Sequence, residues 1–384
     1  MNVLLIGNLA EDRQESMQRF TTLLREGLQS RGHAVTLLVP TLRLARFGPP
    51  YRYGGLPKYL GYFDKLVLFP RQLRRFIRSH RPDVVHIIDQ ASAVYASAVA
   101  GIPVLVTCHD LLQIRAACGE VPQQPVGFFG RKYQAWIRAS LARLRLVACV
   151  SSHTRSDVLR LTPLRPEQVV LIPNALNYPY EPMPAAAARI RLAALSVRHR
   201  LAPAVLDSVG RGFLLHVGGG QWYKNREGLF AIYAGLRSQL SPAPRLVLVG
   251  PSLAATPANG LSPEGERTGI VFLNGVTNPE LAALYSLAKG LVFPSWEEGF
   301  GWPIAEAQAC GCPVFTSNRA PMTEVGGDSS VYFDPGNSSD AASVIAAAWP
   351  GRAGRRALAL TESRRWQPAL MLAAYEALYR RLLP

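Results

Sequence analysis

Residues 294–306 carry the side chains with the clearest chemistry in the sequence. Glu298 stands before a Gly-Phe-Gly run, and Glu306 follows Pro303, a residue type that suits the first turn of a helix. The N-terminus of such a helix presents free N–H groups and a positive dipole end, and glycines let a ligand approach the backbone closely. Carboxylates accept hydrogen bonds from hydroxyl groups. The pattern therefore predicts a site for a diphosphate or for the hydroxyls of a sugar.

Each of these glutamates also has a structural interpretation: Glu298 as a solvated loop carboxylate, and Glu306 as an exposed helix residue. For either residue alone we favour that interpretation. The two together, placed directly after the apolar run Leu291–Phe293, favour a binding site, because ligands of open α/β sheets bind beyond the carboxyl ends of the strands.

A glycine triplet and a lysine follow a second apolar run, Phe213–Val217. Three glycines free the backbone to bend around a phosphate, and a lysine supplies a point charge. A diphosphate leaving group gains negative charge as a glycosidic C–O bond breaks, so a fixed cation stabilises the transition state more than the ground state. Lys224 is the predicted cation, with a solvated lysine at a helix start as the alternative. Arg226 is expected to face elsewhere on the following helix.

His109 comes directly after the apolar run Val104–Cys108, at a predicted strand end that faces the ligand side of a sheet. A neutral imidazole there can donate or accept a proton. The alternative is a buried histidine that hydrogen-bonds to the backbone. For His86, one strand earlier, we expect that structural role.

A framework of alternating strands and helices must position these residues. Residues 1–173 alternate short apolar runs, typical of strands buried on both faces, with amphipathic segments such as Met17–Arg31 and Gln72–His80. This rhythm predicts a parallel sheet with helices on both faces. The expected strands are Val3–Ile6, Ala34–Val39, Val84–Ile88, Val104–Cys108 and Leu146–Val150.

The rhythm restarts after residues 179–212, which we interpret as a linker with a helical lead. The expected strands of the second series are Phe213–Val217, Arg245–Val249, Ile270–Leu273, Leu291–Phe293 and Pro313–Thr316. A helical pattern at Ala369–Leu383 closes the chain. The prediction is an α/β protein with two doubly wound, Rossmann-like domains that face a central cleft. Their expected bounds are 1–174 and 175–365, with a C-terminal helix in 366–384 that crosses back to the first domain.

The segment from Glu298 to Glu306 resembles the Glu-x7-Glu signature of the family 4 retaining glycosyltransferases, which have the GT-B fold. Sequence on both sides is similar to the family's pattern as well, including Asn274-Gly275-Val276 before the signature and Ile172-Pro173-Asn174 at the end of the first domain. The resemblance covers most of the chain and is strongest over residues 213–337.

The resemblance implies transfer of a sugar, with retention, from a nucleotide-diphosphate-sugar to a glycan, lipid-linked or small-molecule acceptor. It implies three catalytic residues: His109, Lys224 and Glu298. The implied donor-binding residues are Gly218, Gly219, Gly220, Asn225, Gly275, Val276, Phe300, Gly301, Trp302 and Glu306. Gly7, Asn8 and Arg19 would lie on the acceptor side. The family usually has an arginine in the glycine loop besides the lysine, and here Gly219, Gly220 and Tyr223 occupy that region.

Neither a metal nor a resident cofactor is expected, and the nucleotide-sugar is a co-substrate. The sequence has no Asp-x-Asp, so the leaving-group charge would be met by Lys224, backbone amides and helix dipoles. The five cysteines match no zinc-ligand spacing and are expected to be reduced and mostly buried. A dinucleotide site is poorly supported, because no GxGxxG follows the first strand.

The net charge of +16 lies mostly in residues 1–173, which hold 23 of the 42 basic residues and 11 of the 26 acidic ones. Two stretches there, between Asp64 and Asp83 and between Glu120 and Asp157, each hold six basic residues and no acidic one. Such segments could bind an anionic membrane surface. A core-packed helix with an arginine-rich face toward solvent explains the pattern equally well. Nucleic acid is not expected as a partner, since no recognition motif is present.

We expect a cytoplasmic protein, and the inner face of the cell membrane is the second location considered. No apolar run reaches the roughly 18 residues that a membrane span needs. Three other functions stay open: a non-catalytic partner protein that binds nucleotide-sugars, a nucleotide-sugar epimerase on the GT-B architecture, and a membrane-binding scaffold.

Overall fold

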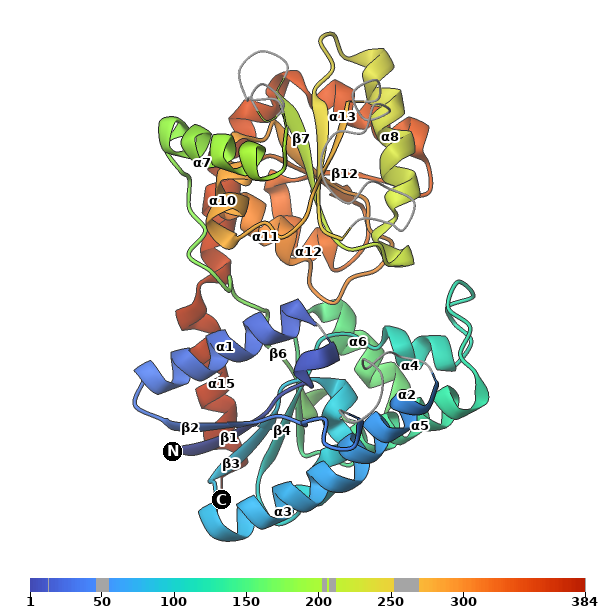
Figure 1. The fold of residues 1–384 in the computed structure, drawn as a ribbon, viewed down its shortest axis with the longest axis vertical. Coiled ribbons are helices and arrows are strands. Elements are labelled where there is room, and N and C mark those ends of the chain that lie inside the picture. Colours follow the sequence, from blue (N-terminus) through green and yellow to red (C-terminus); the bar gives the residue numbers. More distant parts are fainter. Residues whose placement is uncertain (13, 46–54, 202–205, 207–211, 252–268, 384) are drawn as a thin grey trace. The chain divides into compact units, whose positions relative to one another are not determined.

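The computed structural model describes residues 1–12, 14–45, 55–201, 206, 212–251 and 269–383. They form two compact units (Figure 1), Met1–Asn177 with Pro368–Pro384, and Tyr178–Gln367. We call them unit 1 and unit 2. Part of the predicted linker, residues 202–205 and 207–211, lies outside the described residues.

Unit 1 contains a six-stranded sheet in the order β2-β1-β3-β4-β5-β6, with every neighbouring pair parallel. The strands are β1 Asn2–Ile6, β2 Ala34–Leu38, β3 Val84–Ile87, β4 Val104–Cys108, β5 Leu146–Cys149 and β6 Val169–Leu171. The five predicted strands are confirmed. β6 has only three residues, too few to give a periodic signal.

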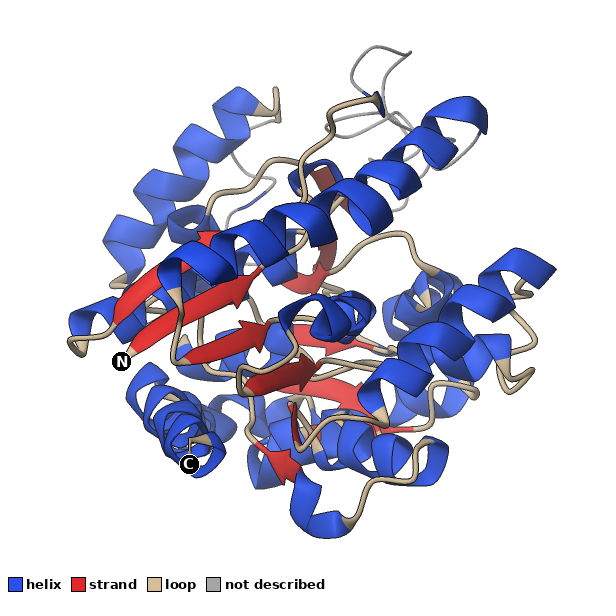
Figure 2. Ribbon diagram, turned by 90° about the horizontal axis from the view of Figure 1, so that it is seen from below, coloured by secondary structure: helices blue, strands red, loops and turns tan. Residues whose placement is uncertain are grey.

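Helices accompany these strands (Figure 2). They are α1 Glu15–Ser30, α2 Gly55–Phe63, α3 Phe69–His80, α4 Leu112–Ala117, α5 Phe128–Leu141, α6 Ser152–Leu161 and the C-terminal α15 Pro368–Leu382. A π-helical stretch, Asp64–Leu68, joins α2 to α3, and a 3-10 helix covers Gln90–Val99. The amphipathic pattern accounts for α1, because its buried residues recur at helical spacing from Met17 to Leu28.

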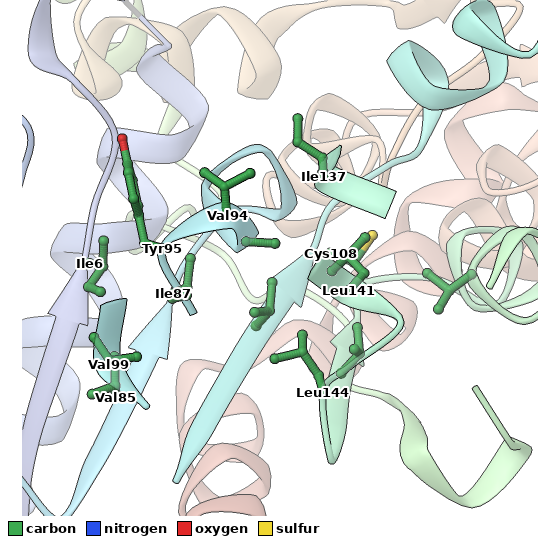
Figure 3. Packing of buried hydrophobic residues seen from close by; sticks show 14 of the residues in the cluster. Ile6, Val85, Ile87, Val94, Tyr95, Val99, Cys108, Ile137, Leu141 and Leu144 are labelled. Atoms are coloured by element: carbon green, nitrogen blue, oxygen red, sulfur yellow. The ribbon is translucent and has the colours of Figure 1, made fainter. Parts of the chain in front are cut away.

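One hydrophobic core of unit 1 lies between the sheet and the helices that cover one of its faces. Side chains of β1, β3 and β4, among them Ile6, Ile87 and Cys108, point toward Tyr95 and Leu141 of the covering helices (Figure 3). This continuous apolar packing fixes the strand ends that carry the polar residues described below.

Unit 2 contains a second six-stranded parallel sheet in the order β12-β11-β10-β7-β8-β9. Its strands are β7 Phe213–Val217, β8 Arg245–Val249, β9 Ile270–Leu273, β10 Gly290–Phe293, β11 Val314–Ser317 and β12 Val331–Phe333. Its helices are α7 Ala185–Arg198, α8 Arg226–Gln239, α10 Asn278–Leu287, α11 Trp302–Ala309, α12 Met322–Gly326, α13 Ser338–Ala348 and α14 Arg355–Ser363. The five predicted strands are present, and the short β12 is the one that the sequence analysis missed.

Each sheet has one point at which the strand order reverses. In unit 2 the chain moves outward from β7 through β8 to β9, and then outward on the other side from β10 to β12. The reversal therefore falls between β7 and β10, and in unit 1 it falls between β1 and β3. Loops separate at such a reversal, so the carboxyl ends of these strands are the natural place for a ligand.

Candidate active site

The loops after β7 and β10 meet at the reversal point of unit 2. The loop after β7 contains the glycine triplet and a 3-10 turn, Trp222–Lys224, and the loop after β10 leads into α11. The backbone N–H of Trp296 donates to the carbonyl of Tyr223 at 2.7 Å, which ties the two loops together. Residues distant in sequence thereby share one edge of the sheet.

Lys224 and Glu298 form an ion pair across these loops. Lys224 Nζ donates to Glu298 Oε1 at 2.7 Å, and their side chains are only 14% and 10% exposed. The ammonium also lies 5.2 Å from the centre of the Phe293 ring, within range of a cation–π attraction. The interpretation of either residue as solvated is therefore wrong, and the structure joins two of the three residues for which the resemblance implies a catalytic role.

Glycine begins the helix that carries Glu306. Gly301 is the N-cap of α11 at φ +101°, a conformation that side chains with a Cβ rarely adopt. Trp302 and Pro303 open the first turn, as predicted. The Phe300 side chain is buried against Trp302 and Trp366, so only its backbone remains for a ligand.

Glu306 lies inside unit 2 and is 2% exposed, so the interpretation as an exposed helix residue is wrong. The hydroxyl of Tyr285, on α10, donates to Glu306 Oε2 at 2.9 Å. Burial raises the pKa of Tyr285 far above its ordinary value, and the nearby charge of Glu306 raises it further. Tyr285 thus stays protonated and holds one carboxylate oxygen in place.

Asn225 has a framework role in the loop that follows β7. It sits in the left-handed region at φ 53° and ψ 48°, and its Oδ1 accepts from the N–H of Gly228. Its Nδ2 donates to the carbonyls of Pro294 at 3.0 Å and Pro335 at 3.2 Å. One amide therefore links the loops that follow β7, β10 and β12.

The expectation that Arg226 faces elsewhere is wrong. The side chain is 6% exposed, and its Nη2 donates to the carbonyl of Gly218 at 2.8 Å. The left-handed turn at Asn225 starts α8 in a direction that brings this first helical residue back to the glycine loop. Asparagine adopts such turns more readily than most residues, but the sequence pattern does not show where the turn directs Arg226.

The other predicted donor-binding residues lie at the carboxyl ends of β7 and β9. Gly218 follows β7, and its N–H donates to the carbonyl of Val249 at 3.0 Å. Gly219 and Gly220 continue this loop. Gly275 and Val276 follow β9, where Arg198 Nη2 donates to the Gly275 carbonyl at 3.2 Å.

His109 belongs to unit 1, where it is buried. Its Nε2 donates to the carbonyl of Ile88 at 3.0 Å, and Phe20 meets the ring edge-on. Burial lowers the pKa of the imidazole, which keeps it neutral. These contacts are the ones expected of a buried histidine that hydrogen-bonds to the backbone, which was the alternative interpretation of His109. His86 also has its expected structural role, since its ring bonds to Tyr379 and Thr107, each at 2.7 Å, and burial lowers its pKa to about 3.

The reversal point of unit 1 holds Gly7 and Asn8, two of the predicted acceptor-side residues. Asn8 Nδ2 donates to the carboxylate of Asp89, which follows β3. A Cβ on Gly7 would lie 2.9 Å from Val39 Cγ1, so any larger residue would have to displace the Val39 side chain. Arg19 lies half-exposed on α1. The sequence analysis missed Asp89, although its place directly after a predicted strand was a usable signal.

Two sequence profiles match this chain. Residues 17–178 match Glycosyltransferase Family 4, and residues 202–358 match Glycosyl transferases group 1. The chain belongs to glycosyltransferase family 4.

Curated relatives of this family 4 chain include mannosyltransferases. The O-antigen chain mannosyltransferase B of Escherichia coli is 31% identical over 210 residues, which are 54% of this chain and 52% of that protein. The serotype-specific mannosyltransferase WbdA of Escherichia coli is 26% identical over 283 residues, 69% of this chain and 32% of that protein. The chain thus spans about half or less of the length of these relatives.

Solved structures show that this family 4 chain has the GT-B fold. Sucrose-phosphate synthase from Thermosynechococcus elongatus superposes with a TM-score of 0.74 at 19% identity, over 99% of this chain and 98% of that one. HepE of Anabaena, solved with UDP and glucose, gives a TM-score of 0.67 at 17% identity, over 98% and 99%.

The described residues contain neither a cluster of metal ligands nor a membrane-spanning helix. Within the described ranges, no group of three or more His, Cys, Asp or Glu side chains could hold a metal ion. All five cysteines are free thiols, and Cys118 is the exposed one. No described helix of this family 4 chain combines the length and apolarity that crossing a bilayer requires.

Proposed function

We propose that this family 4 protein transfers a hexosyl group, with retention and without a metal, from a nucleotide-diphosphate-sugar to a glycan, lipid-linked or small-molecule acceptor. The observation that carries the proposal is the Lys224–Glu298 pair at the reversal point of unit 2. A cation and a carboxylate held together there match the two halves of the donor, its diphosphate and its sugar hydroxyls.

The donor-binding roles follow from the chemistry of each group. Lys224 neutralises the charge that develops on the departing phosphate, and the glycine loop and the first amides of α11 donate hydrogen bonds to its oxygens. Glu298 accepts hydrogen bonds from sugar hydroxyls, which compete with Lys224 for the carboxylate. Glu306, held by Tyr285, accepts from the ribose hydroxyls. The absence of Asp-x-Asp supports a reaction in which protein groups alone meet the phosphate charge.

Retention requires the new bond to form on the face from which the phosphate departs. The anomeric C–O bond to the diphosphate breaks with its electron pair, and the leaving phosphate oxygen takes the proton of the acceptor hydroxyl. The acceptor oxygen then bonds to the anomeric carbon on that same face. This same-face reaction needs no carboxylate nucleophile. We therefore assign Glu298, which is paired with Lys224, to the binding of sugar hydroxyls.

A mannosyl donor and a polysaccharide product are the first choices to test. The names of the curated relatives, O-antigen chain and serotype-specific mannosyltransferases, support them. The names of the mannosyltransferases give no nucleoside base, and the HepE structure with UDP-glucose concerns another sugar. Experiment must therefore identify the base.

The test supplies GDP-mannose, UDP-glucose and ADP-glucose, each with lipid-linked and free glycan acceptors. We expect one donor to release its nucleoside diphosphate only with acceptor present, with EDTA having no effect. The anomeric configuration of the product, determined by NMR, should equal that of the donor. Inverted product contradicts retention, and donor that epimerises without acceptor contradicts transfer.

We also propose that α3 binds anionic lipid headgroups. Arg71, Arg74, Arg75 and Arg78 recur at helical spacing and, with Ser79, line a groove of about 520 Å³. In the described part of the chain, none of the four pairs with a carboxylate.

Vesicle sedimentation tests this surface. The chain should bind phosphatidylglycerol vesicles and not phosphatidylcholine vesicles, and Arg74→Gln with Arg75→Gln should weaken binding. The matched control is Arg189→Gln with Arg191→Gln, which removes two equally exposed arginines from α7. Equal binding by both double variants would show that α3 is not the contact.

A further inference from the structure

The buried guanidinium of Arg226 lies beside the candidate site, although Arg226 is not among the predicted site residues. Its Nη2 donates to Gly218, while Nε and Nη1 are buried with no hydrogen-bond partner among the described residues. A buried charge is costly unless it is paired or serves a bound ion. The site next to it is where the proposed diphosphate would lie.

The contact with Gly218 fixes the direction of a backbone amide. Because the peptide group is planar and trans, the Gly218 carbonyl and the Gly219 N–H point in opposite directions. By holding the carbonyl, Arg226 also fixes where that N–H points. An oriented N–H in a glycine loop is a donor suited to phosphate oxygens.

Gly250, directly after β8, packs closely against the same Gly218 carbonyl. A Cβ on Gly250 would lie 2.2 Å from the Gly218 oxygen and 3.4 Å from Arg226 Nη2. Gly250 also has φ +142°, which side chains rarely adopt. The carbonyl therefore occupies a slot that is open only because residue 250 is glycine.

The charges of Arg226 and Lys224 act on one region. Both contribute, after burial, to lowering the pKa of His216, which is about 4. His216 Nε2 would be 3.2 Å from a Cβ on Gly218, and Lys224 Cδ would be 3.4 Å from that Cβ. The imidazole stays neutral, so the positive charges that these contacts bring beside Gly218 belong to Lys224 and Arg226.

We propose that Arg226 is a positioning residue that orients the Gly218–Gly219 peptide toward a diphosphate and supplies a second positive charge behind it. It would thereby replace the loop arginine that this chain lacks. The inference rests on the proposed function, since it assumes a diphosphate ligand at this loop.

Calorimetric titration tests the role with UDP, GDP and ADP and with their monophosphates. Arg226→Met should weaken binding of the preferred diphosphate about tenfold or more and leave the monophosphate almost unchanged, because one charge-assisted contact is lost. Arg226→Lys should be intermediate. Gly250→Ala keeps both cations but displaces the carbonyl, so it should also reduce the preference for diphosphate. Arg237→Met, on the exposed side of α8, is the matched control and should change neither.

The outcomes separate the two proposals. If the wild-type chain binds no nucleoside diphosphate, the proposed function fails, and this inference fails with it. If the wild-type chain binds one and folded Arg226→Met binds it equally well, only the positioning role is overturned. If Arg226→Met does not fold, Arg226→Lys and Gly250→Ala test the role in its place. The positioning role is overturned if both variants keep the wild-type ratio of diphosphate to monophosphate affinity.

Discussion

At the scale of single residues, the candidate site is a set of polar groups held by buried partners. Lys224 is paired with Glu298, Glu306 is fixed by Tyr285, and Asn225 joins three loops. Partners of this kind keep charged groups oriented before a ligand arrives, which is what electrostatic stabilisation of a transition state requires.

Lys224→Met should lower kcat with the preferred donor by about 10²–10³, the range found when one transition-state contact is removed. Because the change would leave Glu298 buried without its partner, Lys224→Met with Glu298→Gln should be measured beside it. Lys289→Met is the matched control, since Lys289 lies at the opposite end of β10. A wild-type kcat in folded Lys224→Met would refute the role of Lys224 as the leaving-group cation.

His86 should make unit 1 sensitive to acid. Its pKa is about 3 in the folded chain, against about 6.5 when unfolded, so between these values the unfolded chain binds the extra proton. Its contribution is therefore complete above pH 6.5 and declines as the pH falls toward 3. The melting temperature of His86→Gln should change less between pH 7.5 and 4.5 than that of wild type. His80→Gln, at an exposed histidine, should keep the wild-type dependence, and identical curves for all three would contradict the assignment.

At the scale of elements, α15 completes unit 1 although more than 200 residues separate it from the strands it covers. Tyr379 and Tyr375 bond to His86 of β3 and Thr107 of β4, and Glu376 accepts from Arg31 and pairs with His33. The Arg31 hydrogen bond, with His33, holds the pKa of Glu376 near 2. The C-terminal helix is thus part of the framework of unit 1.

The close approach of α15 to α1 at Gly27 can be tested by overpacking. A Cβ on Gly27 would lie 2.4 Å from Leu372 Cδ1. Gly27→Ala should destabilise the protein by about 1–3 kcal/mol in urea denaturation, the usual cost of overpacking. Combined with Leu372→Ala, the two changes should cost less than their sum. If α15 did not contact α1 at this point, Gly27→Ala would instead raise the free energy of unfolding by about 1 kcal/mol, because alanine has the higher helix propensity.

The sequence predicted elements better than side-chain directions. Ten strands follow from continuous apolar runs, whereas β6 and β12, with three residues each, have no period to detect. The places of Glu298, Glu306 and Lys224 beyond strand ends could be predicted, because the strands before them are continuous apolar runs. Arg226 could not, since its direction depends on a left-handed turn at Asn225 that tertiary contacts with Pro294 and Pro335 stabilise.

At the scale of the whole molecule, two six-stranded parallel sheets with different strand orders each present one reversal point. The one in unit 2 holds the cation and the carboxylates, and the one in unit 1 holds Asn8 and Asp89. We propose that unit 2 binds the donor and that unit 1 binds the acceptor. The basic residues of α3 would keep unit 1 near anionic lipid that carries an acceptor.

Binding of a nucleoside diphosphate in unit 2 is the central claim, and the shift in melting temperature of the wild-type chain with UDP, GDP and ADP measures it most directly. We predict that one of the three raises the melting temperature by mass action, and that the shift largely disappears in Lys224→Ala. No shift with any of the three, or an equal shift in Lys224→Ala, would contradict the account.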